Sequence, residues 1–95
     1  MTIVARAASG AISIIRLSGV RALEFARTLS GGGELSPRHA HLKKLHSKSG
    51  ELLDEALVIY FKAPASFTGE DVVEFHTHGG EAASSAIIDE LLALG

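Results

Sequence analysis

Charged side chains embedded in apolar sequence are the first candidates for chemistry in this chain. Glu70, Asp71 and Glu74 lie close together, and Glu74 is flanked by valine and phenylalanine residues typical of a buried strand. A buried carboxylate requires a hydrogen-bonded or charged partner, and Arg16, itself within an apolar stretch, is one that a sheet can supply. The pattern predicts either an ion pair that fixes strand order or a ligand site built from the same groups, and ion pairs are the commoner case.

Histidine pairs are the second candidate. His39 and His41, and likewise His76 and His78, place two imidazoles on one face of a strand. Such a spacing can ligate zinc or another transition metal. No third ligand is evident from the spacing, so we expect ordinary strand-end histidines and no metal site.

Gly79 and Gly80 precede a predicted helix, whose first N–H groups attract anions. A plain tight turn is the alternative, because Glu81 already uses the helix dipole. The sequence contains neither G-x-x-x-x-G-K-[ST] nor G-x-G-x-x-G, the two common nucleotide-phosphate loops. No nucleophile–base pair stands out either. We therefore expect no catalytic residue in this chain and no GTP hydrolysis by it.

Composition narrows the class of protein. The 95 residues suit one small domain, and a hydrophobic content of 46% excludes a disordered chain. A net charge of −2 gives no overall attraction to nucleic acid. The absence of cysteine excludes a disulfide scaffold and suits a cytosolic protein. The apolar run at 11–17 is short and includes Arg16, so it is neither a signal peptide nor a membrane span.

Hydrophobic periodicity and turn residues predict an alternation of strands and helices. The expected strands cover residues 2–5, 11–18, 38–46, 52–62 and 71–77. The expected helices cover residues 20–29 and 82–94. A turn is expected at 8–10, and the near-continuous apolarity of 11–18 predicts a central strand covered on both faces.

This order of elements predicts an α+β fold, with a mixed or antiparallel sheet of about five strands and two helices on one face. The final helix has no following strand, which leaves a sheet edge open to a partner. The polar residues of 66–80 fall at the two ends of one strand, a position where sites are commonly built on a rigid scaffold.

Several segments resemble the N-terminal domain of the MnmE (TrmE) family of tRNA modification GTPases. The resemblance runs nearly the whole length of the chain. It rests on T-I-V-A at 2–5, G-A-I-S-I-I-R-L-S-G at 10–19, P-R-H-A at 37–40 and D-E at 54–55. Its most specific part is S-F-T-G-E-D-V-V-E-F at 66–75 followed by H-G-G at 78–80.

The resemblance implies a domain similar to the folate-binding domain of the glycine-cleavage T protein. Domains of this family bind 5-formyltetrahydrofolate or a related one-carbon folate and mediate homodimer formation. The full-length proteins add a helical domain and a Ras-like GTPase domain that uses GTP, Mg and K. With the flavoprotein MnmG (GidA), they modify the wobble uridine of certain tRNAs. The implied location is cytoplasmic, with no membrane partner.

The sequence departs from the family pattern in two places. Only residues 6–9 separate T-I-V-A from G-A-I, where family members have a longer loop with a Thr-Pro and a glycine. The family domain also continues past Gly95 with a segment resembling P-G-E-F-T-x-R-A-F-x-N. We therefore expect 1–95 to be a single N-terminal domain truncated at its C-terminal end. Family members often carry glutamine at position 76, which argues further against a metal site.

The expected folate pocket combines carboxylates, a cation and a helix start. A pterin ring presents an N–H and an amino group side by side, which a carboxylate can accept in a bidentate way, while the glutamate tail calls for a cation or a helix N-terminus. The pocket would be completed across a dimer or by the segment that follows Gly95. The residues expected in it are Arg16, Thr68, Gly69, Glu70, Glu74, His78 and Gly79.

Two alternatives remain open at this point. One is a structural or dimerisation fragment without a functional ligand site. The other is a small metal-binding domain that uses His39, His41, His76 and His78.

Overall fold

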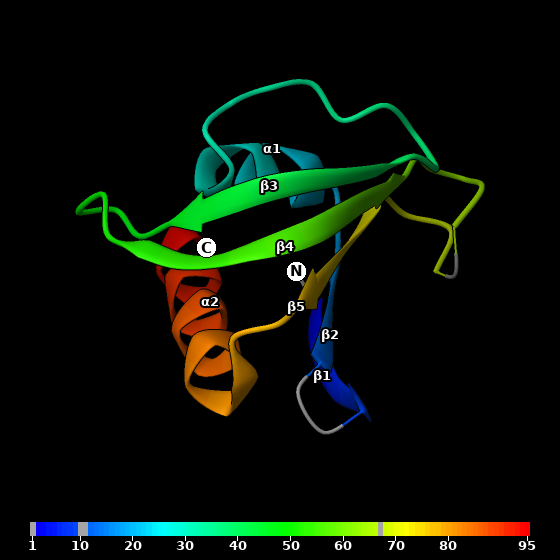
Figure 1. Cartoon of the computed structure of the whole chain (residues 1–95). Helices are drawn as coiled ribbons and strands as arrows, with labels where there is room; N and C mark the ends of the chain where they lie inside the picture. Colours follow the sequence, from blue (N-terminus) through cyan, green and yellow to red (C-terminus); the bar gives the residue numbers. More distant parts are fainter. Residues whose placement is uncertain (1, 10–11, 67) are drawn as a thin grey trace.

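The computed structural model describes residues 2–9, 12–66 and 68–95, which form a five-stranded sheet and two helices (Figure 1). The strands are β1 (Thr2–Ser9), β2 (Ile12–Ser18), β3 (Ala40–His46), β4 (Leu52–Phe61) and β5 (Val72–Thr77). The helices are α1 (Ala22–Leu29) and α2 (Gly80–Leu94). In space the strands run β1-β2-β5-β4-β3, and each neighbouring pair is antiparallel.

Both helices cover the same face of this sheet, and the core lies between them and the strands (Figure 1). Successive strand residues point to opposite faces, so Ile15, Val58 and Phe75, which are register partners, all enter the core with 0% exposure. Phe25 of α1 and Ile87 of α2 pack against the same cluster. The predicted α+β fold, with two helices on one face of the sheet, is confirmed.

Two local predictions were wrong. The turn expected at 8–10 is wrong for residues 8 and 9, which belong to β1; Ser9 pairs with Ile12 of β2 after a register shift. Gly10, the last residue of that turn, lies outside the described residues. Strand β2 is interior, but it is covered on one face only: Ile15 is fully buried, whereas Ile12 and Ile14 on the other face are half-buried.

The face of the sheet away from the helices, called here the open face, carries apolar side chains that reach solvent. Val4 of β1 is 47% exposed, Leu57 of β4 37% and Leu42 of β3 61%. The register places all three on the same face as Arg16 and Glu74. Val4 is the direct partner of Arg16. Leu57 lies two residues from Ile59, the partner of Glu74, and Leu42 is the partner of Leu57. Among the described helices, neither is long and apolar enough to cross a bilayer.

Helix α2 should be anchored to the sheet by Leu91 and not by its neighbour Leu92. Leu91 is 0% exposed in the core, and Leu92 is 59% exposed. We expect Leu91→Ala to lower the free energy of unfolding by about 2–5 kcal/mol, because it leaves a cavity, and Leu92→Ala to change it by less than about 0.5 kcal/mol. Urea denaturation of both variants measures the difference. Equal losses would contradict this packing of α2.

Candidate functional site

Arg16, Glu74 and His76 form a polar cluster on the open face. Arg16 and Glu74 are direct partners across β2 and β5. The Arg16 guanidinium donates two hydrogen bonds to Glu74 Oε2, from Nη2 at 2.8 Å and from Nε at 3.1 Å. His76 Nε2 lies 3.1 Å from Glu74 Oε1. The pairing of Arg16 with Glu74 proposed from the sequence is therefore present, in what we call the Arg16–Glu74–His76 cluster.

The carboxylate of Glu74 is the buried member of this cluster. Residue 74 is only 7% exposed, while the side chains of Arg16 and His76 are 37% and 27% exposed. An ionised carboxylate has about four acceptor positions, and the described contacts use three of them. Sequence analysis missed the role of His76, although residues i and i+2 of a strand share a face and would have indicated it.

The loop before β5 is tied to the sheet next to this cluster. The hydroxyls of Thr68 and Ser18 are 2.8 Å apart, and the Glu70 N–H donates to Thr68 Oγ1 at 3.3 Å. Ser66 Oγ donates to the Glu70 carbonyl oxygen. Gly69 has a φ of 81°, a left-handed conformation that favours glycine. The turn presents the Glu70 side chain to solvent.

Asp71, between this loop and β5, is a structural residue. Its Oδ1 accepts hydrogen bonds from the Ala63 N–H at 2.9 Å and from the Tyr60 hydroxyl at 3.3 Å. Its carbonyl oxygen accepts the Gly19 N–H at 2.9 Å. Burial raises the pKa of the Tyr60 phenol, and the charge of Asp71 and the hydrogen bond to it raise that pKa further.

The other end of β5 is pinned by a different aspartate. Asp54 Oδ2 accepts the N–H groups of His78 at 2.9 Å and Gly79 at 3.1 Å, just before α2. A Cβ at Gly79 would lie 2.6 Å from Ala83 Cβ, so only glycine fits there. Of the two glycines expected to offer N–H groups to an anion, Gly79 thus already has an acceptor from within the chain.

Of the seven residues predicted for the site, the structure groups Arg16 and Glu74 with the Thr68–Glu70 turn. His78 and Gly79 lie beyond the opposite end of β5. At about 3.4 Å per residue, Glu74 and His78 are separated by roughly 14 Å along the strand. The predicted set is therefore divided between the two ends of one strand.

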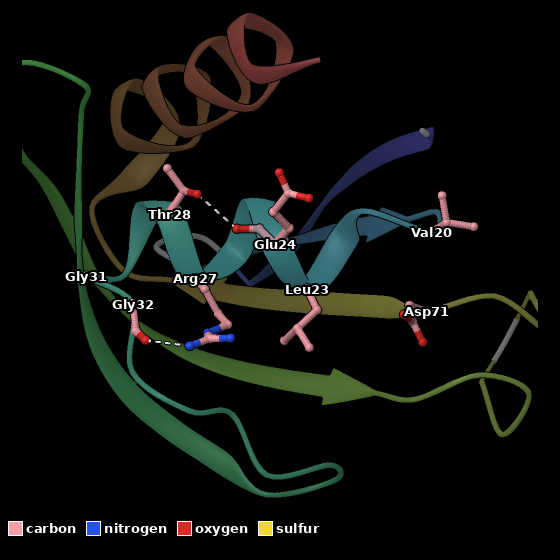
Figure 2. A pocket seen from close by; sticks show the side chains of 8 residues that line it. All are labelled: Val20, Leu23, Glu24, Arg27, Thr28, Gly31, Gly32 and Asp71. Atoms are coloured by element: carbon pink, nitrogen blue, oxygen red, sulfur yellow. Dashed lines mark hydrogen bonds between the residues drawn. The ribbon is translucent and has the colours of Figure 1, made fainter.

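A hollow of about 640 Å³ lies elsewhere, along α1 (Figure 2). Its polar groups are engaged locally: Arg27 donates to the Gly32 carbonyl oxygen at 2.9 Å, and Thr28 donates to that of Glu24 at 3.0 Å. None of the seven predicted site residues lines it. The lining residues are Val20, Leu23, Glu24, Arg27, Thr28, Gly31, Gly32 and Asp71.

A second hollow, of about 340 Å³, lies beside the loop that precedes β5. Its lining includes Arg38, whose guanidinium lies 5.6 Å from the ring centroid of Phe61 and donates to the Ala65 carbonyl oxygen at 3.1 Å. Phe61 occupies the same face of β4 as Ile59, the direct partner of Glu74. Arg38 was missed in the sequence because a cation after a proline carries no pattern that places it beside a particular strand.

The histidines are dispersed in the described residues. His41 Nε2 accepts the Ser36 N–H at 3.1 Å, His76 contacts Glu74, and His78 Nδ1 lies 3.3 Å from the Glu55 carbonyl oxygen. The described ranges contain no group of three or more His, Cys, Asp or Glu side chains that could hold a metal ion.

An antiparallel α+β domain with this sequence corresponds to a known family. The family model described as "GTP-binding protein TrmE N-terminus" matches residues 1–95. The chain therefore belongs to the TrmE N-terminal family.

Curated relatives named "tRNA modification GTPase MnmE" support this assignment. The protein of Campylobacter jejuni (strain 81-176) is 59% identical over 86 residues, which cover 90% of this chain and 20% of the relative. That of Campylobacter fetus (strain 82-40) is 57% identical over 98 residues, which cover 100% and 22%. That of Sulfurovum sp. (strain NBC37-1) is 51% identical over 84 residues, which cover 88% and 19%. The chain thus spans about a fifth of the length of these relatives.

Tyr60 offers a direct test of the contacts at Asp71, because it is the single tyrosine and there is no tryptophan. We expect its phenol to ionise above pH 10 in the folded chain. Since the folded-state pKa is raised, the associated stability is present below pH 10 and is lost as the pH rises through the folded-state pKa. Absorbance titration of phenolate measures this.

The variant Asp71→Asn should move the Tyr60 midpoint part of the way back, because burial remains while the charge is removed. Asp89→Asn on α2 is the matched control and should leave the midpoint in place. A Tyr60 that titrates as in the urea-unfolded chain would show that it is not buried against Asp71.

Proposed function

We propose that this chain is the folate-binding and dimerisation domain of a tRNA modification GTPase of the MnmE type. The observation that carries the proposal is the Arg16–Glu74–His76 cluster beside the Thr68–Glu70 turn, on an open sheet face, in a member of this family. In the full-length protein, GTP would bind a separate domain, and MnmG and tRNA would be the partners in modifying the wobble uridine.

The contacts indicate different roles in binding for Glu70 and Glu74. Glu74 has about one acceptor position left after its contacts with Arg16 and His76. Glu70 is exposed, and no described side chain forms an ion pair with it. Both oxygens of Glu70 are therefore available for the adjacent N–H groups of a pterin, while Glu74 holds Arg16 in place at the pocket wall.

The glutamate tail of a folate requires a cation or free N–H groups within reach of the pocket. Asp54 accepts the amides of His78 and Gly79, so the α2 start offers a tail carboxylate little attraction unless Asp54 moves. Arg38, beside the second hollow and on the same side of the sheet as Glu74, is a cation that the tail could reach instead.

Calorimetric titration with 5-formyltetrahydrofolate tests the pocket. Removal of a charged hydrogen-bonding partner costs about 1.5–3 kcal/mol, so Glu70→Ala and Arg16→Ala should each weaken binding roughly ten- to a hundredfold. The matched controls are Glu24→Ala and Arg21→Ala, an exposed Glu–Arg pair on and next to α1. Those controls should bind as tightly as the unsubstituted chain.

The folded state of each variant is checked by urea denaturation, because Arg16→Ala also removes a partner of buried Glu74. Glu70→Ala avoids that complication, since its side chain is exposed. The titration is repeated on a chain extended by the P-G-E-F-T segment expected from the resemblance. If folded Glu70→Ala and Arg16→Ala bind like the controls in both contexts, the pocket lies elsewhere and the cluster is a structural ion pair.

The open face is the surface that we propose for dimerisation. It presents Val4 and Leu57 to solvent around the half-buried cluster, and a two-fold partner seated there would bury these apolar groups and close the pocket. This arrangement would join the two roles of the domain on one surface.

Substitution of Leu57 by glutamate should therefore weaken self-association, because it would place a charge in an apolar contact. Sedimentation equilibrium at micromolar concentrations measures the effect. Leu92→Glu, on the exposed side of α2, is the control and should leave the dimer intact. A monomeric unsubstituted chain, or equal loss in both variants, would refute the proposed interface.

A further inference from the structure

Positive charge is concentrated in one segment of this weakly acidic chain. Residues 35–50 contain four of the nine Lys and Arg residues and three of the five histidines. The same segment contains none of the eleven Asp and Glu residues, so the remaining five cations are outnumbered by carboxylates elsewhere. Although the net charge is −2, positive and negative side chains are therefore unevenly distributed along the sequence.

The fold places this segment on one edge of the sheet. β3 is the last strand in the order β1-β2-β5-β4-β3, and the hairpin to β4 continues the same edge (Figure 1). We call this edge the basic rim, made up of His39, Lys43, Lys44, His46 and Lys48. Two of its lysines, Lys43 and Lys44, lie on β3, and the third, Lys48, lies in the hairpin that follows. The rim is therefore a line of charge along an edge and not a single point.

The lysines of the rim form no ion pair within the described residues. No side chain of the rim forms one of the ion pairs found there, which involve Arg16, Arg21 and His76. Glu55 of β4 is the direct cross-strand partner of Lys44, and Glu90 accepts the backbone N–H of Lys48 at 3.3 Å. Neither carboxylate forms an ion pair with a lysine ammonium group. Lys44 and Lys48 are exposed, and Lys43 is half-buried.

We propose that the basic rim binds the phosphate backbone of tRNA. The inference rests on the proposed function, which makes tRNA a partner of the full-length protein, and it adds the surface that this domain would contribute. Lysines bind phosphates as point charges without base specificity. The Ser47 and Ser49 hydroxyls beside Lys48 are further groups that can donate to phosphate oxygens.

Protection of the sheet edge explains the presence of lysines on β3 but not the absence of carboxylates from residues 35–50. Charged side chains on an edge strand prevent edge-to-edge association, and lysine is common there. A mixture of both signs would serve that purpose as well, whereas residues 35–50, which include the rim, contain no Asp or Glu. A single sign over an extended line attracts a polyanion. An acidic protein is the other partner that such a line could attract, and the experiment separates the two.

The test is fluorescence anisotropy of a labelled tRNA transcript titrated with the chain at KCl concentrations from about 20 to 200 mM. The variant Lys43→Gln/Lys48→Gln removes two rim charges that do not belong to the open face or its pocket. The charge-matched control, Arg21→Gln/Lys62→Gln, removes two cations outside the rim. We expect the rim variant to bind more weakly and to lower the salt slope by roughly 1.4–1.8, since each lost phosphate contact removes about 0.7–0.9.

The control should keep the slope of the unsubstituted chain, and urea denaturation confirms that both variants are folded. Three outcomes overturn the proposal: no tRNA binding at about 20 mM KCl, equal weakening by both variants, or rim-dependent binding of poly-L-glutamate without binding of tRNA, which would indicate an acidic protein partner. Folate titration of the rim variant should match the unsubstituted chain. Absence of folate binding by the unsubstituted chain, with rim-dependent tRNA binding retained, would refute the folate pocket alone.

Discussion

The double pairing of β5 is the constraint on which the rest of the structure depends. β5 is hydrogen-bonded to β2 on one side and to β4 on the other. A slip by one residue would exchange the faces of the strand, moving Phe75 out of the core and Glu74 into it. The cost of that exchange fixes the register, and the register alone brings Arg16 opposite Glu74. Burial of hydrocarbon on one face thereby positions the polar cluster on the other.

Two aspartates outside the cluster complete this arrangement at the ends of β5. Asp71 binds the entering loop through Ala63 and Tyr60, and Asp54 binds the amides that lead into α2. Each carboxylate satisfies backbone or hydroxyl donors that would otherwise lack acceptors in a partly buried turn. Because Asp54 and Asp71 serve structure and Glu74 is buried, Glu70 is the exposed member of these four acidic residues.

The sheet offers three surfaces with different chemistry, and each suits a different kind of contact. One face is covered by both helices and forms the core. The open face combines apolar side chains with the Arg16–Glu74–His76 cluster, which suits a flat heteroaromatic ligand or a second copy. The β3 edge carries the basic rim. A small domain can therefore keep polyanion contacts, at the β3 edge, apart from the open face, which suits both a ligand and a second copy.

By itself, the sequence determined the type and order of the elements, because strand and helix periodicities are local properties. It also indicated Arg16 as one partner that a sheet could supply for Glu74, since a buried carboxylate requires a hydrogen-bonded or charged partner. The tertiary structure was needed to show that β2 is covered on one face and that Asp54, rather than a ligand, accepts the amides of His78 and Gly79. These outcomes depend on which distant strands become neighbours, and side-chain spacing along one chain carries no information about contacts made across the sheet.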